Sequence, residues 1–257
     1  MSEIILKQGD CLELMKDIPD KSIDMILCDL PYGTSACKWD SIIPFKQLWE
    51  HYERIIKDDG AIILFGSEPF SSYLRLSNIK LYKYDWKWEK PNGANFLNFK
   101  YQPSKCYEDI MVFGKCAVSY TKKINMKYNP QMSVGKPYNQ ISGKQKNDNG
   151  HVLGATVRSP IKQVCTENNG TRYPRAIQKF SLDKNKLHPT QKPIALLEYL
   201  IKTYTNENDT ILDNCMGSGS TGVAAKNLNR NFIGFELDKN YFNIAKERIN
   251  NAQTEKR

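Results

Sequence analysis

Short apolar runs alternate with segments of helical period along much of this chain, and this alternation restricts the fold more than any other feature of the sequence. The apolar runs predict buried strands over 4–7, 23–28, 61–65, 110–113, 210–212 and 231–235. Helical spacing predicts helices over 44–57, 193–204, 221–228 and 239–249, with Pro193 in a first turn and Thr190 as a cap before it. We therefore expect an open α/β sheet with helices on both faces.

The alternation stops between about Lys115 and Lys186, where the chain is rich in Asn, Gln, Lys, Gly and Pro. This stretch holds 14 basic and three acidic residues, a net charge of +11, whereas the whole chain carries +9. Positive charge with interleaved aromatic rings is typical of a nucleic-acid-binding surface, and a disordered loop is the alternative interpretation. We expect DNA contacts from Lys122, Lys123, Lys127, Lys136, Arg158, Arg172 and Arg175.

A glycine-rich loop follows one predicted strand and opens the next helix. Gly217 and Gly219 allow the backbone to approach a ligand, and Gly222 allows close packing of helix on strand. The next strand ends in Glu236, whose carboxylate can accept both hydroxyl groups of a ribose. Asp213 stands before the glycines, where it suits a ligand with an ammonium group better than a pyrophosphate. This combination favours S-adenosylmethionine over a nicotinamide dinucleotide, and a plain tight turn is the alternative.

A second candidate site segment, Asp29-Leu30-Pro31-Tyr32, follows the strand predicted at 23–28. The exocyclic amine of a base is a poor nucleophile because its lone pair is delocalised into the ring. The Asp29 carboxylate and the Leu30 carbonyl can accept the two amine protons and direct the lone pair at a methyl donor. Tyr32 can stack on a base that has left the duplex. The alternative is a strand-terminating turn with a surface tyrosine.

The cysteine pattern and the apolar runs restrict the compartment. Seven cysteines, an odd number without a Cys-x-x-Cys pair, predict neither a disulfide framework nor a zinc site. The first residues lack a signal-peptide pattern, and no apolar run approaches the ~18 residues that a membrane helix needs. We therefore expect a cytoplasmic protein with no metal and no membrane partner.

The order of these motifs resembles that of one family. The chain is similar to the amino-methyltransferases of bacterial and phage restriction-modification systems, in the permuted arrangement called the beta group. In that arrangement the catalytic tetrapeptide comes first, the target-recognition region second and the glycine loop last. Further matches are Trp39-Asp40, the segments Trp86 to Asn92 and Tyr107 to Phe113, and the element His188 to Pro193. The resemblance covers residues 1–113 and 188–250 and leaves out the basic region.

The resemblance implies a Rossmann-like, circularly permuted S-adenosylmethionine-dependent methyltransferase sheet with an inserted target-recognition region. It implies a catalytic half over 1–114, a recognition region over 115–187 and a cofactor-binding half over 188–257. Asp29, Leu30, Pro31 and Tyr32 then form the catalytic segment. The implied cofactor pocket consists of Asp10, Cys11, His188, Thr190, Lys192, Asp213, Met216, Gly217, Ser218, Gly219 and Glu236.

Some of these implied roles have alternatives. Asp10 would accept from the cofactor's adenine amine and the Cys11 amide would donate to its ring, whereas a solvent-exposed aspartate is the other interpretation. His188 would border the methionine end of the cofactor or cap a helix. Lys192 can also pair with a carboxylate or lie at the surface. The family usually has a second proline where this chain has Leu30, but the backbone carbonyl remains.

The acidic form of the tetrapeptide favours the N6 of adenine, because relatives that act on the N4 of cytosine more often carry Ser there. Methylation of cytosine C5 is disfavoured, since it needs a Cys that usually follows Pro and the chain has no Pro-Cys dipeptide. We thus expect site-specific N6-adenine methylation of double-stranded DNA with the target base flipped out. N4-cytosine transfer, an RNA substrate and a DNA-binding module without catalysis stay open as alternatives.

Two further classes fit the sequence less well. Enzymes that methylate glutamine in release factors place the glycine loop before a similar Asn-Pro-Pro-Tyr loop and lack a large basic insert. A nicotinamide oxidoreductase would need a hydride-transfer site, and we identify none. The oligomeric state stays open, a homodimer included.

Overall fold

The computed structural model describes residues 2–33, 41–141, 165–183 and 191–252. The chain divides into two compact units. Unit 1 is drawn from residues 1–129 and 175–257, and unit 2 from residues 130–174. Unit 1 contains the glycine loop and the Asp29 segment, so it carries the candidate site.

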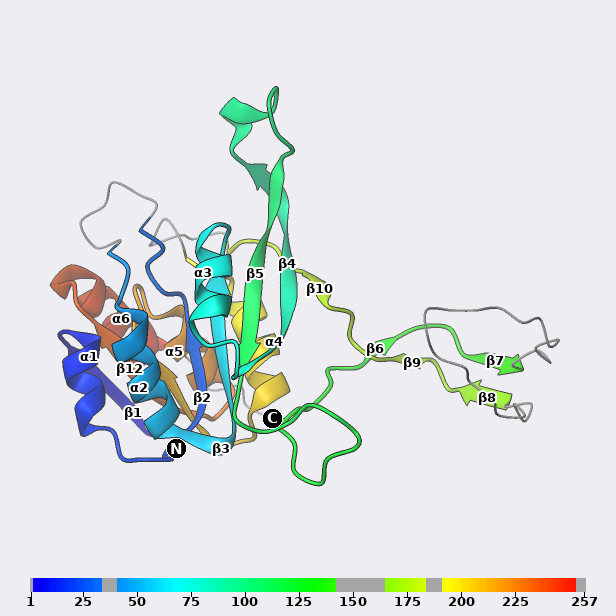
Figure 1. Ribbon diagram of the computed structural model, residues 1–257, viewed down its shortest axis with the longest axis horizontal. Helices are drawn as coiled ribbons and strands as arrows, with labels where there is room; N and C mark the ends of the chain where they lie inside the picture. Colours follow the sequence, from blue (N-terminus) through cyan, green and yellow to red (C-terminus); the bar gives the residue numbers. More distant parts are fainter. Residues whose placement is uncertain (1, 34–40, 142–164, 184–190, 253–257) are drawn as a thin grey trace. The chain divides into compact units, whose positions relative to one another are not determined.

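An eight-stranded sheet in the order β1-β12-β11-β2-β3-β5-β4-β10 forms the centre of unit 1 (Figure 1). Its strands are β1 (Ile4–Gln8), β2 (Ile23–Cys28), β3 (Ile56–Gly66), β4 (Tyr82–Ala94), β5 (Lys105–Phe113), β10 (Ile177–Lys179), β11 (Thr210–Asp213) and β12 (Asn231–Glu236). β5 runs antiparallel to β3 and β4, and the other pairings in this sheet are parallel. The carboxyl ends of all strands but β5 therefore share one edge, which we call the carboxyl edge.

Helices cover both faces of the sheet. One face carries α1 (Cys11–Leu14), the 3-10 turn Met15–Asp17, α2 (Phe45–Ile55) and α3 (Phe70–Ser77). The other carries α4 (Ile194–Tyr204), α5 (Ser220–Asn227) and α6 (Lys239–Asn251). β2 is buried along its whole length, with Met25 and Leu27 in one core cluster and Ile26 and Cys28 in the other. A strand buried on both sides reads as a continuous apolar run, which is the pattern that its sequence shows.

The structure confirms the expected open α/β sheet. It adds α1, α3 and β10, which the sequence did not predict, and it shifts the ends of several predicted elements. The helix predicted over 44–57 ends at Ile55, because Ile56 already belongs to β3. α4 begins after Pro193, and the Asp183 carboxylate accepts from the Ile194 amide at 3.3 Å. The predicted cap Thr190 lies outside the described residues. Asp183 is 11 positions away from the amide that it caps, so local sequence patterns did not reveal it.

The observed division of the chain at 130 and 174 differs from the expected division at 115 and 187. Met126 is buried in the core of unit 1, and the Asn129 amide donates to the Thr203 carbonyl at 2.7 Å. On the returning segment, β10 pairs with β4. Both ends of the basic region are therefore part of the sheet domain.

The described residues of unit 2 form two short antiparallel pairs, for which the sequence predicted no elements. β6 (Ser133–Val134) pairs with β9 (Thr171–Arg172), and β7 (Tyr138–Ile141) pairs with β8 (Cys165–Asn168). The guanidinium of Arg172 donates to the Lys136 carbonyl at 2.5 Å and lies 4.7 Å from the centre of the Tyr138 ring. These contacts connect the two pairs of strands.

In the described part of the chain, no helix combines the length and the apolar character that crossing a membrane requires.

Candidate active site

Four neighbouring parallel strands bring the main predicted site residues to the carboxyl edge. Asp10 follows β1, Glu236 ends β12, Asp213 ends β11 and Asp29 follows β2. Gln8 lies opposite Glu236 in the register of the sheet. Adjacent strands are ~4.8 Å apart, so the Asp29 segment and the glycine loop adjoin although most of the chain separates them. Their meeting place is the edge where parallel sheets generally bind ligands.

Asp29 meets two partners where it leaves β2. The Tyr32 hydroxyl donates to Asp29 Oδ1 at 2.7 Å, and Lys192 Nζ pairs with Asp29 Oδ2. The Tyr32 ring stacks on Phe70 with ring centres 4.8 Å apart and an angle of 25° between the planes. An ionised carboxylate has about four acceptor sites. Asp29 therefore keeps acceptor capacity beyond these two bonds.

Leu30, the residue that departs from the family pattern, anchors this segment. Its side chain is 3% exposed and belongs to the core cluster beneath α2 and α3. Its burial holds the backbone between Asp29 and Tyr32 against the sheet.

Lys192, from the loop before α4, is the buried centre of an ion cluster. Its Nζ pairs with Asp29 and lies 3.4 Å from Glu108 Oε2, while Lys90 pairs with the other Glu108 oxygen. Burial alone lowers the pKa of Lys192, but the charges of Asp29 and Glu108 outweigh burial and raise that pKa. Burial raises the pKa of Glu108, but Lys192 and Lys90 outweigh it and lower that pKa. The pKa shifts of Lys192 and Glu108 both favour their charged forms, and the cluster joins Asp29 to β5 and β4.

The glycine loop has the left-handed backbone conformation for which its sequence is suited. The φ angles of Gly217 and Gly219 are +52° and +80°. A Cβ added to Gly217 would meet nothing within 4 Å, whereas one on Gly219 would lie 2.9 Å from Ala245. A Cβ on Gly222 would lie 2.7 Å from Phe232 in β12, which bears out the predicted close packing of helix on strand. Gly217 alone of the three therefore faces open space.

One buried and one half-buried carboxyl group flank this loop, those of Asp213 and Glu236. Glu236 Oε2 accepts from the Gly217 amide at 2.8 Å, and burial raises the pKa of Glu236. Asp213 Oδ1 accepts from the Cys215 amide at 3.2 Å, and burial raises the pKa of Asp213 to about 7. A nearby cation would favour the charged form of both groups, so the pocket suits a positively charged ligand.

Asp10 has a local role that the sequence did not predict. Its Oδ1 accepts from the Leu12 amide at 2.8 Å and the Glu13 amide at 3.4 Å, which caps α1. The Gly9 amide donates to the Glu236 carbonyl at 2.9 Å and so ties the end of β1 to β12. Asp10 and Cys11 therefore lie close to Glu236, the acid that accepts from the Gly217 amide.

Two loop residues that were predicted for the cofactor pocket have side chains engaged within the protein. The Met216 side chain lies in the core cluster, next to Gly234. The Ser218 hydroxyl accepts from Arg248 at 2.9 Å, and its carbonyl accepts from the same guanidinium at 2.5 Å. Both side chains are engaged within the protein because α6 and the sheet close over this part of the loop. His188 and Thr190, also predicted for the pocket, lie outside the described residues.

Lys127, which was predicted to contact DNA, pairs with two acids of the protein. Its Nζ pairs with Asp209 Oδ2 at 2.6 Å and Asp24 Oδ1 at 3.3 Å. Asp24 is the second residue of β2 and Asp209 directly precedes β11, so Lys127 lies at the amino ends of these strands. It neutralises two acids of the protein at the edge opposite the candidate site.

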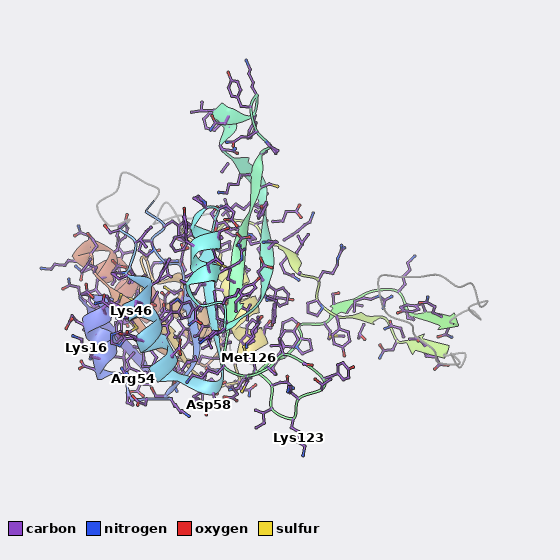
Figure 2. The ribbon with its side chains drawn as sticks, viewed as in Figure 1. Lys16, Lys46, Arg54, Asp58, Lys123 and Met126 are labelled. Atoms are coloured by element: carbon purple, nitrogen blue, oxygen red, sulfur yellow. The ribbon has the colours of Figure 1, made fainter. Side chains whose placement is uncertain are left out.

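The other basic residues predicted to contact DNA are distributed over both units. Lys122 and Lys123 are exposed on the loop that ends at Lys127, with Lys123 on its outer bend (Figure 2). They follow the antiparallel strand β5 and so adjoin the edge away from Asp29. Lys136 and Arg175 are exposed, Arg172 makes the internal contacts of unit 2 described above, and Arg158 lies outside the described residues.

Sequence reasoning did not identify Glu108, Lys90 and Phe70 as part of the site. Glu108 and Lys90 belong to segments that the family resemblance had marked, but only the pairing of β4 with β5 brings them together near Lys192. Phe70 begins α3, and no local pattern indicated that it would support Tyr32. Lys192 was predicted for the cofactor pocket or a carboxylate, and the structure pairs it with the catalytic candidate Asp29.

Comparisons with known proteins find relatives that match most of this chain. The sequence profile of a family described as DNA methylase matches residues 23–247. The Type II methyltransferase M2.LlaDCHI of Lactococcus lactis subsp. cremoris is 31% identical over 97% of this chain and 90% of its own length. The Type II methyltransferase M1.MboII of Moraxella bovis is 28% identical over 96% of this chain and 97% of its own length.

Two solved structures are similar in fold. The complex of M1.HpyAVI with SAM covers 95% of this chain and 99% of its own, with a TM-score of 0.59 and 28% identity. The cytosine-N4-specific PvuII DNA methyltransferase covers 98% of this chain and 89% of its own, with a TM-score of 0.68. Its identity to this chain is 17%, so this second likeness concerns the fold alone.

Proposed function

This chain belongs to the DNA methylase family, and from that premise we propose that it transfers a methyl group from S-adenosylmethionine to the N6 of adenine in duplex DNA. One observation carries the proposal. The Asp29 segment and the glycine loop, far apart in sequence, end adjacent strands at one edge of the sheet. A base amine held at Asp29 would therefore lie close to a cofactor held at the glycine loop.

S-adenosylmethionine is the cofactor, as in the related complex of M1.HpyAVI with SAM. It supplies an activated methyl group on a sulfonium. The described residues fit such a cation, because Asp213 and Glu236 are carboxyl groups whose burial raises their pKa values. Gly217 leaves open space in which a ligand can approach the backbone.

We assign the holding of the cofactor to four residues. Asp213 would meet its ammonium group and Glu236 its ribose hydroxyl groups. Gly217 would provide backbone contact, and Asp10 would accept from the adenine amine with the oxygen that does not cap α1. Each contact is a proposal from the chemistry of the donor set.

Asp29 would act on the target amine. Its carboxylate accepts one amine proton in a hydrogen bond, and the Leu30 carbonyl accepts the other, so the nitrogen lone pair is no longer shared with the ring. Tyr32 donates to Asp29 and stacks on Phe70 with one face of its ring, and a flipped base would stack on the other face. After transfer the amine nitrogen carries an extra proton, which the Asp29 carboxylate can take.

Lys192 would keep Asp29 ready for this role. Lys192 is buried against Asp29 and places a fixed positive charge beside Asp29 Oδ2. This contact would orient the carboxylate so that Oδ1 and the Leu30 carbonyl are directed at the target amine. Glu108 also contacts the Lys192 ammonium group. The positive charge of Lys192 is therefore shared between two acids and is held in place from two sides.

The choice of adenine as the target base rests on Asp29, the acid in the tetrapeptide. A restriction-modification setting is supported by the named relatives, which are Type II methyltransferases. The direct test is expression in a host without DNA methylation, followed by mapping of the modified bases. We expect N6-methyladenine within one short recurring sequence. Methylated cytosine, methylated RNA alone or unmodified DNA would each contradict the proposal.

The role of Asp29 is tested by Asp29→Ala in a single-turnover assay. We expect transfer to fall at least about a hundredfold while cofactor affinity changes little, since Asp29 would touch the amine more than the cofactor. Asp20→Ala is the matched control, because Asp20 is an exposed acid before the amino end of the same strand and pairs with Arg54. Equal rates for Asp29→Ala and the wild type would refute the assignment.

A further inference from the structure

The tip of the β4–β5 hairpin, residues 95–104, carries an unusual surface. Phe96, Leu97, Phe99 and Tyr101 are 72%, 80%, 49% and 86% exposed. Single exposed apolar residues are common, but a contiguous group of large ones usually marks a surface that binds a partner.

Hydrogen bonds within the hairpin tip hold these side chains outward. Asn95 has a left-handed backbone with φ of +63°, its Oδ1 accepts from the Lys105 amide at 2.9 Å, and its Nδ2 donates to the Pro103 carbonyl at 3.3 Å. The 3-10 turn Phe96–Asn98 follows, and the Asn98 carbonyl accepts from the amides of Tyr101 and Gln102. The backbone of the tip is therefore a shaped element that presents apolar rings to solvent.

The charge of the hairpin end matches a polyanion. Residues 90–107 contain Lys90, Lys100 and Lys105 and no acidic residue. Lys90 is occupied by Glu108, which leaves Lys100 and Lys105 nearest the tip. Lysines beside exposed aromatic rings suit phosphates next to stacked bases.

The hairpin tip lies on the same side of the sheet as the candidate active site. β4 runs parallel to β3, because both are antiparallel to β5, so β4 ends beyond the carboxyl edge. At the base of the hairpin, Glu108 contacts Lys192, the partner of Asp29. Lys105 is three residues from Glu108, so the tip begins on the order of 10 Å beyond the ion cluster. Figure 1 shows this end of the hairpin extending away from the other strands of the sheet.

We propose that the hairpin tip enters duplex DNA beside the target base, with Phe96 and Leu97 as an apolar wedge and Lys100 at a phosphate. The inference rests on the proposed function, since it adds a DNA-inserting element to the same site. Proteins that kink DNA use this side-chain chemistry to separate stacked bases. The wedge would occupy the space of the extruded base and so favour the flipped state at Asp29.

The test compares Phe96→Ala/Leu97→Ala with the wild type on unmethylated chromosomal DNA from a host without DNA methylases, using labelled cofactor. Leu76→Ala/Ile79→Ala is the matched control. Leu76 and Ile79 are 72% and 60% exposed, and Ile79 precedes the amino end of β4, at the opposite end of that strand from the tip. Cofactor affinity by calorimetry and mass by sedimentation are measured for all three proteins.

We expect the tip variant to transfer methyl groups at least about tenfold more slowly than the wild type and the control, with cofactor affinity and oligomeric state unchanged. Equal transfer by the tip variant overturns the inference. A loss of transfer accompanied by dissociation of a dimer also overturns it, because a second copy of the chain would then be the partner of the tip. A wild type that transfers to no DNA overturns the proposed function itself.

A second measurement separates insertion from simple DNA contact. On a duplex that carries the mapped site, a mismatch at the target base lowers the cost of extrusion. The tip variant should recover most of its deficit on the mismatched duplex. A deficit that persists at full size would overturn the wedge.

Discussion

Asp213→Asn should make the protein without cofactor more stable at pH 8 while it weakens cofactor binding. Asp213 is 3% exposed, and burial raises its pKa from 3.8 to about 7. At pH 8 the carboxyl group is charged in both the folded and the unfolded chain, so folding has to bury a charge. Asparagine has nearly the same shape, removes the charge, and can still accept from the Cys215 amide.

The magnitude follows from the two pKa values. A rise from 3.8 to about 7 corresponds to about 4 kcal/mol of unfavourable free energy for the folded, ionised state. Because the folded state binds the proton more tightly, Asp213 contributes stability that is lost as pH rises from about 4 to about 7. The gain from asparagine should therefore be about 4 kcal/mol at pH 8 and under about 2 kcal/mol at pH 5.

Urea unfolding of the cofactor-free proteins at both pH values measures this gain. Asp24→Asn is a control of opposite sign. Asp24 is also buried, but Lys57, the Thr210 amide and Lys127 outweigh burial and lower its pKa. Its charge contributes stability above its unfolded pKa, so Asp24→Asn should lower stability at pH 5 and at pH 8 alike.

Calorimetry with S-adenosylmethionine completes the test. A cation near Asp213 favours the ionised carboxyl, so asparagine should reduce cofactor affinity by at least about tenfold. Stability and affinity thus move in opposite directions, as they do where a binding site stores an unfavourable charge. An Asp213→Asn protein that is less stable than the wild type at pH 8, or that gains equally at pH 5, would refute the reasoning.

Two further predictions concern charged side chains near the site. Lys192→Met should lower the free energy of unfolding by about 3 kcal/mol, because it leaves two acids without their buried cation; an unchanged free energy in urea unfolding would show that the ion cluster does not stabilise the fold. Lys100→Gln should reduce the slope of log affinity for DNA against log salt concentration by about 1. Lys123→Gln should leave this slope unchanged, because Lys123 lies on the opposite edge of the sheet. Filter binding at several salt concentrations measures both slopes, and a reversed result would place the DNA on the other edge.

The amino-acid sequence determined the fold class and most of the element positions. β2 spans Ile23–Cys28 as its apolar run predicted, and α4 and α6 begin within one residue of the predicted starts. Runs of apolar residues and helical spacing are local properties, so they can be read without knowing which elements pack together. The same holds for the glycine loop, because a left-handed backbone at Gly217 and Gly219 depends on local sterics.

The basic region shows the limit of composition. Its net charge pointed to DNA, but charge alone does not say where a lysine lies. Lys127 pairs with Asp24 and Asp209, residues that are far away in sequence and that meet it only because β2 and β11 are neighbours. The hairpin tip contains fewer lysines than the basic region, so its net charge did not mark it as a candidate DNA contact.

The sequence by itself thus determined which residues carry chemistry, since Asp29, Asp213 and Glu236 each follow or end a strand that local patterns reveal. The tertiary structure decided which of them meet. Strand order places β11 and β12 beside β2, and pairing of β4 with β5 places Glu108 against Lys192 and so against Asp29. Local patterns cannot specify such contacts. The contacts depend on strand order, and strand order is set by the burial of both faces of the sheet, which involves the whole chain.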